Sequence, residues 1–154
     1  GGPMLTLFNE ASEIITCIAT LGKKCDHFVL SFSKGNNSEQ IYYQCASALA
    51  TWGLSQIRNQ FEESLKISLR KENKFQSVAL LPGSTNWNIK DQCKIYHLTK
   101  AEKIGVKIEN NCFLNPIYSL SFAIGIGNKS FQFENVNRCD YCDRKHSCPY
   151  FSEK

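Results

Sequence analysis

The chain has 154 residues, and its 18 lysine and arginine residues are scattered among 14 acidic residues, which gives a formal net charge of +4. Nucleic-acid binding requires basic side chains concentrated on one surface, and a membrane-spanning helix requires about 20 consecutive apolar residues. The sequence shows neither pattern, so we expect no nucleic acid and no membrane among its partners. Its length predicts one domain.

Residues 1–3, Gly-Gly-Pro before Met4, are interpreted as a cloning remnant outside the fold. After Met4 no basic segment leads into an apolar segment, as a secretion signal would require. We therefore expect a cytoplasmic protein. In that compartment the eight cysteines are expected to be thiols or metal ligands and not a disulfide framework.

The first half of the chain predicts one strand followed by two helices. The run from Glu13 to Thr20, EIITCIAT, is β-branched and apolar, which is typical of a buried strand. Apolar residues then recur at helical spacing from Cys25 to Phe32 and stop at the polar segment 34–37. Ser38 is the predicted N-cap of a long scaffold helix, whose apolar positions keep helical spacing to about Arg70.

The middle of the chain predicts a strand, a turn and a shorter helix. Gln76 to Leu81 has the pattern of a short strand, and Pro82-Gly83 ends it in a turn. Asn88 is a suitable cap for a helix that continues to about Leu98.

Two further strands are predicted, Val106 to Leu114 and Ser119 to Gly127, which we expect to pair as a hairpin joined at Asn115-Pro116. Together the elements predict an α+β fold over residues 4–127, in which a helical N-terminal half packs on an antiparallel sheet. The tail, residues 128–154, is polar and cysteine-rich. It cannot form a core by itself and is expected to bind metal.

The tail contains the sequence CDYCDRKHSCPY, in which Cys139, Cys142 and Cys148 have the spacing C-x2-C-x5-C and proline follows the last cysteine. Two thiolates separated by two residues can bind one metal from a tight turn, and the third can join them after a short loop. A Cys-Pro ending is also typical of ferredoxin-type cysteine runs. The motif therefore predicts an iron–sulfur cluster, most simply of the 4Fe-4S type.

Such a cluster takes four thiolates, so a fourth ligand has to come from outside the motif. Cys112 is the candidate, because it lies at the end of a predicted strand beside polar residues. The alternative is a zinc site in which His146 completes a Cys3His set. Ordinary free thiols, or a disulfide formed on oxidation, also stay open for the tail. The remaining cysteines fall on apolar faces and are interpreted as small buried hydrophobic residues: Cys17, Cys25, Cys45 and Cys93.

The segment from Ser77 to Gly127 resembles the activation domain of cobalamin-dependent methionine synthase. The resemblance covers about a third of the chain well. The matching features are Pro82-Gly83, Trp87, Ala101 to Val106, Pro116, and Ser119 to Ser121 with the Gly-Ile-Gly that follows. The resemblance implies a C-shaped α+β domain that docks on a cobalamin-binding methyltransferase. Short stand-alone relatives of that domain also carry a C-terminal cysteine motif and a cysteine at the position of Cys112, which adds weight to a four-cysteine set.

In that family S-adenosylmethionine is held by an arginine and a tyrosine around the Pro-Gly turn, and these positions are Ala79 and Ser84 here. A glutamate of the family corresponds to Asn110. Without the guanidinium and the aromatic ring, we expect S-adenosylmethionine to bind weakly or not at all. Pro82 and Gly83 keep the turn and are the candidate cofactor-binding residues, because the backbone N–H groups around Gly83 suit a small anion.

No nucleophile–base pair or carboxylate dyad suggests that the chain is an enzyme by itself. The function expected from the cysteines and the resemblance is an accessory or reactivation subunit of a cobalamin-dependent methyltransferase, which carries an iron–sulfur cluster for electron transfer or structure. The alternative is a non-redox binding module whose zinc site only stabilises the tail.

Overall fold

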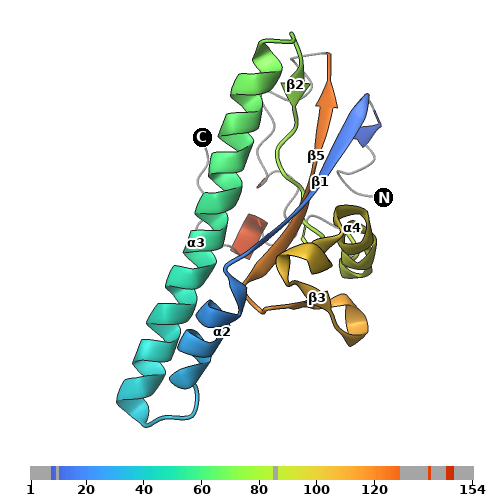
Figure 1. The fold of residues 1–154 in the computed structure, drawn as a ribbon. Helices are drawn as coiled ribbons and strands as arrows, with labels where there is room; N and C mark the ends of the chain where they lie inside the picture. The colour runs from blue at the N-terminus through green and yellow to red at the C-terminus, as the bar shows by residue number, and fades with distance from the viewer. Residues whose placement is uncertain (1–7, 10, 85–86, 129–138, 140–144, 148–154) are drawn as a thin grey trace.

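The computed structural model describes residues 8–9, 11–84, 87–128, 139 and 145–147 (Figure 1). The helices of this part are α2 (Gly22–Ser31), α3 (Asn37–Arg70) and α4 (Gln92–Thr99), with short 3-10 turns η1 (Ile89–Asp91), η2 (Ala101–Ile104), η3 (Asn110–Cys112) and η6 (Lys145–Ser147). The strands are β1 (Glu13–Thr20), β2 (Phe75–Gln76), β3 (Lys107–Ile108), β4 (Leu114–Asn115) and β5 (Ser119–Gly127).

Strand β5 is the centre of the larger sheet, whose described strands have the order β1-β5-β2 and run antiparallel. From Ser121 onward every residue of β5 is buried, since the strand is covered on both faces. Gly125 is needed there because a Cβ atom would lie 2.9 Å from the ring of Phe8. By contrast, β1 is at an edge and has no fully buried residue, so the prediction that it is a buried strand is wrong although its bounds are confirmed.

Helix α3 covers one face of this sheet and is much longer than the strands (Figure 1). At about 1.5 Å per residue its 34 residues extend roughly 50 Å, whereas the nine residues of β5 extend about 30 Å. Leu65 packs against Phe122 and Ile124 of β5. The N-terminal half of α3 continues beyond the end of the sheet, where α2 lies beside it and supplies Val29 to a second cluster with Ala50 and Leu54.

The opposite face is covered by α4, η2 and the small β3–β4 hairpin, so the described residues form three layers. Ala101, Val106 and Leu114 are buried there against Ile18 of β1. The predicted α+β class with helices on an antiparallel sheet is confirmed at this level. The helical half is not purely helical, because β1 precedes both helices and pairs with a strand about a hundred residues later.

The predicted hairpin of two long strands is wrong. Ser119–Gly127 does form a strand, but it pairs with β1 and β2. The segment 106–114 is interrupted at η3, where Asn111 and Cys112 both have positive φ, and only Lys107–Ile108 and Leu114–Asn115 pair with each other. A left-handed backbone at two successive residues cannot continue a strand.

The starts of the helices follow side-chain capping. Asn36, not the predicted Ser38, caps α3, because its Oδ1 accepts hydrogen bonds from the N–H groups of Ser38 and Glu39. The Glu39 carboxylate in turn accepts from the Asn36 N–H at 2.9 Å, which completes a capping box. The predicted cap Asn88 is confirmed: its side chain accepts from the N–H of Lys90 at the start of η1, which leads directly into α4.

Candidate functional site

The predicted metal ligands of the tail lie mostly outside the described residues. Cys142 and Cys148 are outside them, whereas Cys139 is partly buried and His146 is exposed in η6. Among the residues that the structure does describe, no group of three or more histidine, cysteine or acidic side chains is arranged to hold a metal ion. The convergence of Cys139, Cys142 and Cys148 therefore stays a prediction.

Cys112, the predicted fourth ligand, is joined to Cys93 by a disulfide. The two Cα atoms are 5.3 Å apart, within the usual range for such a bond. Cys93 is in the first turn of α4 and Cys112 is in η3, and both are partly exposed. The interpretation of Cys93 as a buried hydrophobic residue is wrong. Cys112 can bind a metal only after this disulfide is reduced, because the ligand is a thiolate.

Hydrogen bonds hold the turn around Cys112 independently of its sulfur. The Gln92 side-chain N–H donates to the Cys112 backbone carbonyl at 2.7 Å. The Ser121 hydroxyl of β5 donates to the side-chain Oε1 of Gln92, also at 2.7 Å. Both Gln92 and Ser121 are buried, which makes these bonds costly to break. The turn is thus attached to the central strand, and Cys112 is expected to keep its place when reduced.

The Pro82-Gly83 turn is closed by its own backbone. Gly83 has φ +82°, which favours glycine, and a Cβ atom there would also meet Ile89 at 2.9 Å. The Gly83 N–H donates to the Trp87 carbonyl at 2.8 Å, and the Ser84 N–H donates to the Leu81 carbonyl at 3.1 Å. The N–H groups of Gly83 and Ser84, which were the predicted donors to an anion, are therefore both bonded within the turn. Binding at Pro82 and Gly83 stays a prediction that would require the turn to open.

The position that the resemblance equates with the family's arginine faces the core. Ala79 is fully buried and packs with Phe122 and Ile124. Its N–H donates to the Glu62 carboxylate at 3.4 Å. The observed backbone thus places Ala79 in the core, and the expectation of weak or no S-adenosylmethionine binding stays a prediction.

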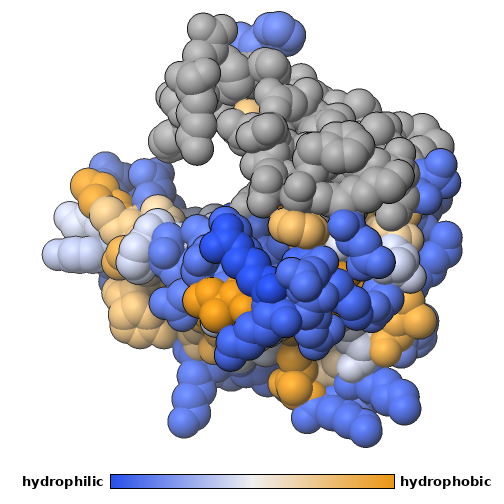
Figure 2. All heavy atoms as spheres, turned by 90° about the horizontal axis from the view of Figure 1, so that it is seen from above, coloured by the Kyte–Doolittle hydropathy of each residue, from blue (hydrophilic) through white to orange (hydrophobic). Residues whose placement is uncertain are grey.

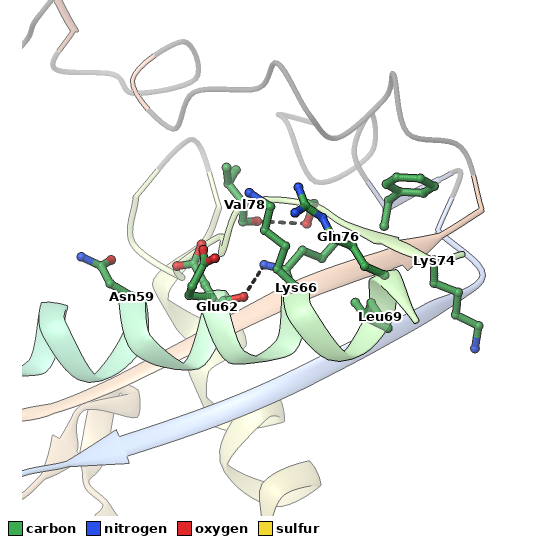
Figure 3. Close-up of a pocket in the computed structure, with 11 residues that line it drawn as sticks. Asn59, Glu62, Lys66, Leu69, Lys74, Gln76 and Val78 are labelled. Atoms are coloured by element: carbon green, nitrogen blue, oxygen red, sulfur yellow. Dashed lines mark hydrogen bonds between the residues drawn. The ribbon is translucent and has the colours of Figure 1, made fainter. Parts of the chain in front are cut away.

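A cavity of about 500 Å3 lies between the second half of α3 and the segment after it (Figure 3). Its charged lining carries both signs and comprises Glu62, Glu63, Lys66, Arg70 and Lys74. Glu62 contributes its carboxylate to an ion pair with Arg58 at 3.3 Å, and its carbonyl accepts from the Gln76 side chain at 2.8 Å. These contacts attach the segment 76–79 to α3, so we interpret Glu62 as structural and not as a catalytic acid or base.

A second cavity of about 530 Å3 lies along β1 and includes the Cys17 side chain among mostly apolar neighbours from α3 and η2. Burial raises the pKa of the Cys17 thiol to about 11. Burial, and then the charge of the adjacent Asp26, also raise the pKa of Cys25. Both thiols are therefore neutral at physiological pH, which makes them poor nucleophiles and poor metal ligands. Cys45, predicted to be buried, is exposed.

The partnership of Cys93 with Cys112 is the feature that sequence reasoning missed. The two residues are 19 apart in the sequence and lie in different elements, so no periodic pattern relates them. The clue was the early end of the strand at the polar Asn110 and Asn111, which are typical of a turn. A turn at this place brings Cys112 back toward the start of α4.

Comparison with known proteins adds no assignment. No protein family matches the chain, and no curated protein is similar to it. Within the part that the structure describes, no helix combines the length and the apolar composition that a membrane span needs.

Proposed function

We propose that the chain is an accessory or reactivation subunit of a cobalamin-dependent methyltransferase, and that its tail binds a 4Fe-4S iron–sulfur cluster. The observation that carries the proposal is the C-x2-C-x5-C-P motif, which places Cys139, Cys142 and Cys148 within ten residues. This density of thiolates is typical of a cluster site. We further propose that the chain works in the cytoplasm, where thiols are kept reduced.

The corrinoid partner is supported by the resemblance of the segment from Ser77 to Gly127, which includes α4 and the central strand β5. When bound, an iron–sulfur cluster transfers one electron at a time, which is what cobalamin in the Co(II) state requires to return to its cycle. Since Ala79 and Ser84 lack the groups that hold S-adenosylmethionine, we expect this chain to contribute the electron and not the methyl-donor site.

Cys112 is the proposed fourth ligand, and its disulfide with Cys93 sets a condition on cluster assembly. While the disulfide is intact, Cys112 has no thiolate to offer. Reduction releases the Cys112 thiolate, and the hydrogen bond from Gln92 to its carbonyl keeps the turn in place. The proposal therefore predicts that an oxidised sample takes up iron poorly and that a reduced sample takes it up fully.

This prediction is tested by anaerobic reconstitution of the full chain with iron and sulfide, with and without prior reduction. The reduced protein should become brown, absorb broadly near the visible violet, lose that absorption with dithionite and contain iron and sulfide in equal amounts. Cys112→Ser should abolish assembly. Cys93→Ser is the matched control, because it removes the same disulfide but keeps the Cys112 thiolate, and it should assemble the cluster.

His146→Ala separates the proposal from its alternative. It should leave cluster assembly intact, because a thiolate is the usual fourth ligand of such a cluster. If instead the protein is colourless with one zinc per chain, and His146→Ala releases that zinc while Cys112→Ser does not, the chain is a non-redox binding module with a structural Cys3His site.

A further inference from the structure

The first half of α3 is apolar on two opposite faces. One face packs into the core through residues such as Ala50 and Leu54, with α2 beside it. The other face points away from the core and contains Ile41, Leu49 and Trp52, which are 62%, 67% and 63% exposed. Cys45, between them, is also exposed. We call the four residues Ile41, Cys45, Leu49 and Trp52 the outward stripe.

The spacing of the outward stripe is four, four and three residues, so its members lie on one line along the helix. Apolar residues spaced three and four apart form the seam of paired helices, and the order four, four, three corresponds to one eleven-residue repeat. This half of α3 extends past the sheet (Figure 1), and the strands therefore do not cover it. An apolar line of this length on a projecting helix is typical of an interface.

Charge distinguishes the two halves of the helix. From Gln40 to Ile57 the sequence has no acidic, lysine, arginine or histidine residue. The same outward line then continues with Glu63, Lys66 and Arg70, which are all exposed. Figure 2 views the molecule from the end where α3 finishes, and the coloured surface there is mainly hydrophilic. The outward stripe is thus the uncharged part of an otherwise charged helix face.

We propose that the outward stripe is the interface for a second copy of this chain, with the two α3 helices antiparallel about a two-fold axis. An axis between Ala48 and Leu49 places Leu49 of one copy opposite the small, exposed Ala48 of the other. It also places the large Trp52 opposite the small Cys45. These two large side chains therefore each meet a small one, as close packing requires, and Ile41 lies opposite Gln56. A parallel pair would place Trp52 against Trp52.

The absence of ionisable side chains from the outward stripe favours a second copy of this chain as its partner. Two copies of a stripe without ionisable groups can approach without like-charge repulsion, whereas the charged second half of α3 could not be buried in this way without desolvating ions. A different protein partner would normally be selected by charge at the rim of the interface, and this segment offers none between Gln40 and Ile57.

The available area is also suitable. A stable interface buries about 800 Å2 on each partner, and a large aromatic side chain accounts for roughly 150–250 Å2. Trp52 of the stripe and Tyr42, next to Ile41, are each about three-fifths exposed. They could therefore contribute about 240 Å2 per chain, or nearly a third of the required area. The aliphatic stripe residues and the polar side chains beside them would supply the rest.

The proposal is tested by sedimentation equilibrium of the full chain under reducing conditions, over a wide range of concentration. The wild type should have the mass of a dimer. Leu49→Glu places a carboxylate in the interface and should weaken dimerisation by about a hundredfold or more. Ile67→Glu is the matched control, because Ile67 is also exposed on α3 but lies in the charged half, and this variant should stay dimeric. Circular dichroism should be the same for all three.

Orientation is tested by cross-linking. In Trp52→Cys, mild oxidation should join residue 52 of one copy to Cys45 of the other, and peptide mapping by mass spectrometry should identify that bond. The bond should disappear when Cys45→Ser is added. A wild type that stays monomeric at the highest concentration, a Leu49→Glu variant that stays dimeric, or cross-links only between identical positions would overturn the antiparallel self-pairing. A monomeric wild type would leave the stripe to a different partner.

Discussion

Asp26 is the residue that ties the projecting helices to the sheet. It is a buried carboxylate on α2, and it accepts hydrogen bonds from the backbone N–H groups of Ile117 at 2.6 Å and Tyr118 at 3.2 Å. These two residues immediately precede β5, so one side chain fixes the entry to the central strand. Nothing in the periodicity of the sequence marks Asp26, because the sites that it binds are more than ninety residues away and are backbone groups.

We predict that Asp26→Ala lowers the free energy of unfolding by about 2–3 kcal/mol, because it leaves two N–H groups without an acceptor where water has poor access. The urea midpoint measures the change. Asp26→Asn, which keeps one acceptor oxygen, should lose less. Lys23→Ala, a change at an exposed position of the same helix, is the control and should alter the midpoint little. Equal effects of Asp26→Ala and Lys23→Ala would contradict this role.

At the residue scale the site was only partly predictable. The tail motif could be recognised because its three cysteines lie within ten residues of one another, and their convergence on one metal stays a prediction. The disulfide partner of Cys112 could not, since it depends on how η3 turns back toward α4. The burial of Ala79 and the closed turn at Gly83 likewise depend on contacts with β5 and Trp87 that no local pattern contains.

At the scale of elements, local sequence patterns predicted where helices and strands lie, but they did not predict which strands pair. Glu13–Thr20, the long helix ending at Arg70 and the strand Ser119–Gly127 were predicted within a few residues, because each has a continuous pattern of its own. The predicted pairing partner of Ser119–Gly127 was wrong. The strand nearest in sequence would have been residues 106–114, paired with β5 as a hairpin. The turn at Asn111 and Cys112 interrupts that strand, and β5 pairs with the more distant β1 instead.

The capping of α3 by Asn36 can be tested by substitution. Asn36→Ala removes the side-chain oxygen that accepts from the N–H groups of Ser38 and Glu39. It keeps the backbone N–H that donates to the Glu39 carboxylate, and it should cost about 1 kcal/mol of stability. Ser38→Ala is the matched control, because Ser38 was the predicted cap but its side chain makes no capping contact in the structure. Thermal unfolding should show the loss for Asn36→Ala and almost none for Ser38→Ala. The reverse order would restore Ser38 as the cap.

At the scale of the whole molecule, the Cys93–Cys112 disulfide joins two elements of the same layer, helix α4 and the turn η3 between β3 and β4. It closes a loop across 19 positions of sequence, and a cross-link of this size stabilises a fold by about 3 kcal/mol, mainly by restricting the unfolded chain. We expect the oxidised protein to be more stable than the reduced protein by about this amount in urea unfolding.

The control is a variant with both cysteines replaced by serine, whose stability should not respond to reductant. All samples need the same protein concentration, because association would also change the apparent stability. If the double variant loses as much stability on addition of reductant as the wild type does, the difference arises from another pair of cysteines.

The central position of β5 has a consequence for how the protein is made. Neither β1 nor β2 has its sheet partner until Gly127 has been synthesised, about a hundred residues after β1. At roughly 5–20 residues per second, β1 waits several seconds or more with its ladder groups unpaired. Helix α3 ends at Arg70, so it is synthesised before β5 and can present its two apolar faces for the rest of that interval. Nascent chains on neighbouring ribosomes could then meet through α3 before either sheet is closed, so assembly between copies can precede completion of the fold.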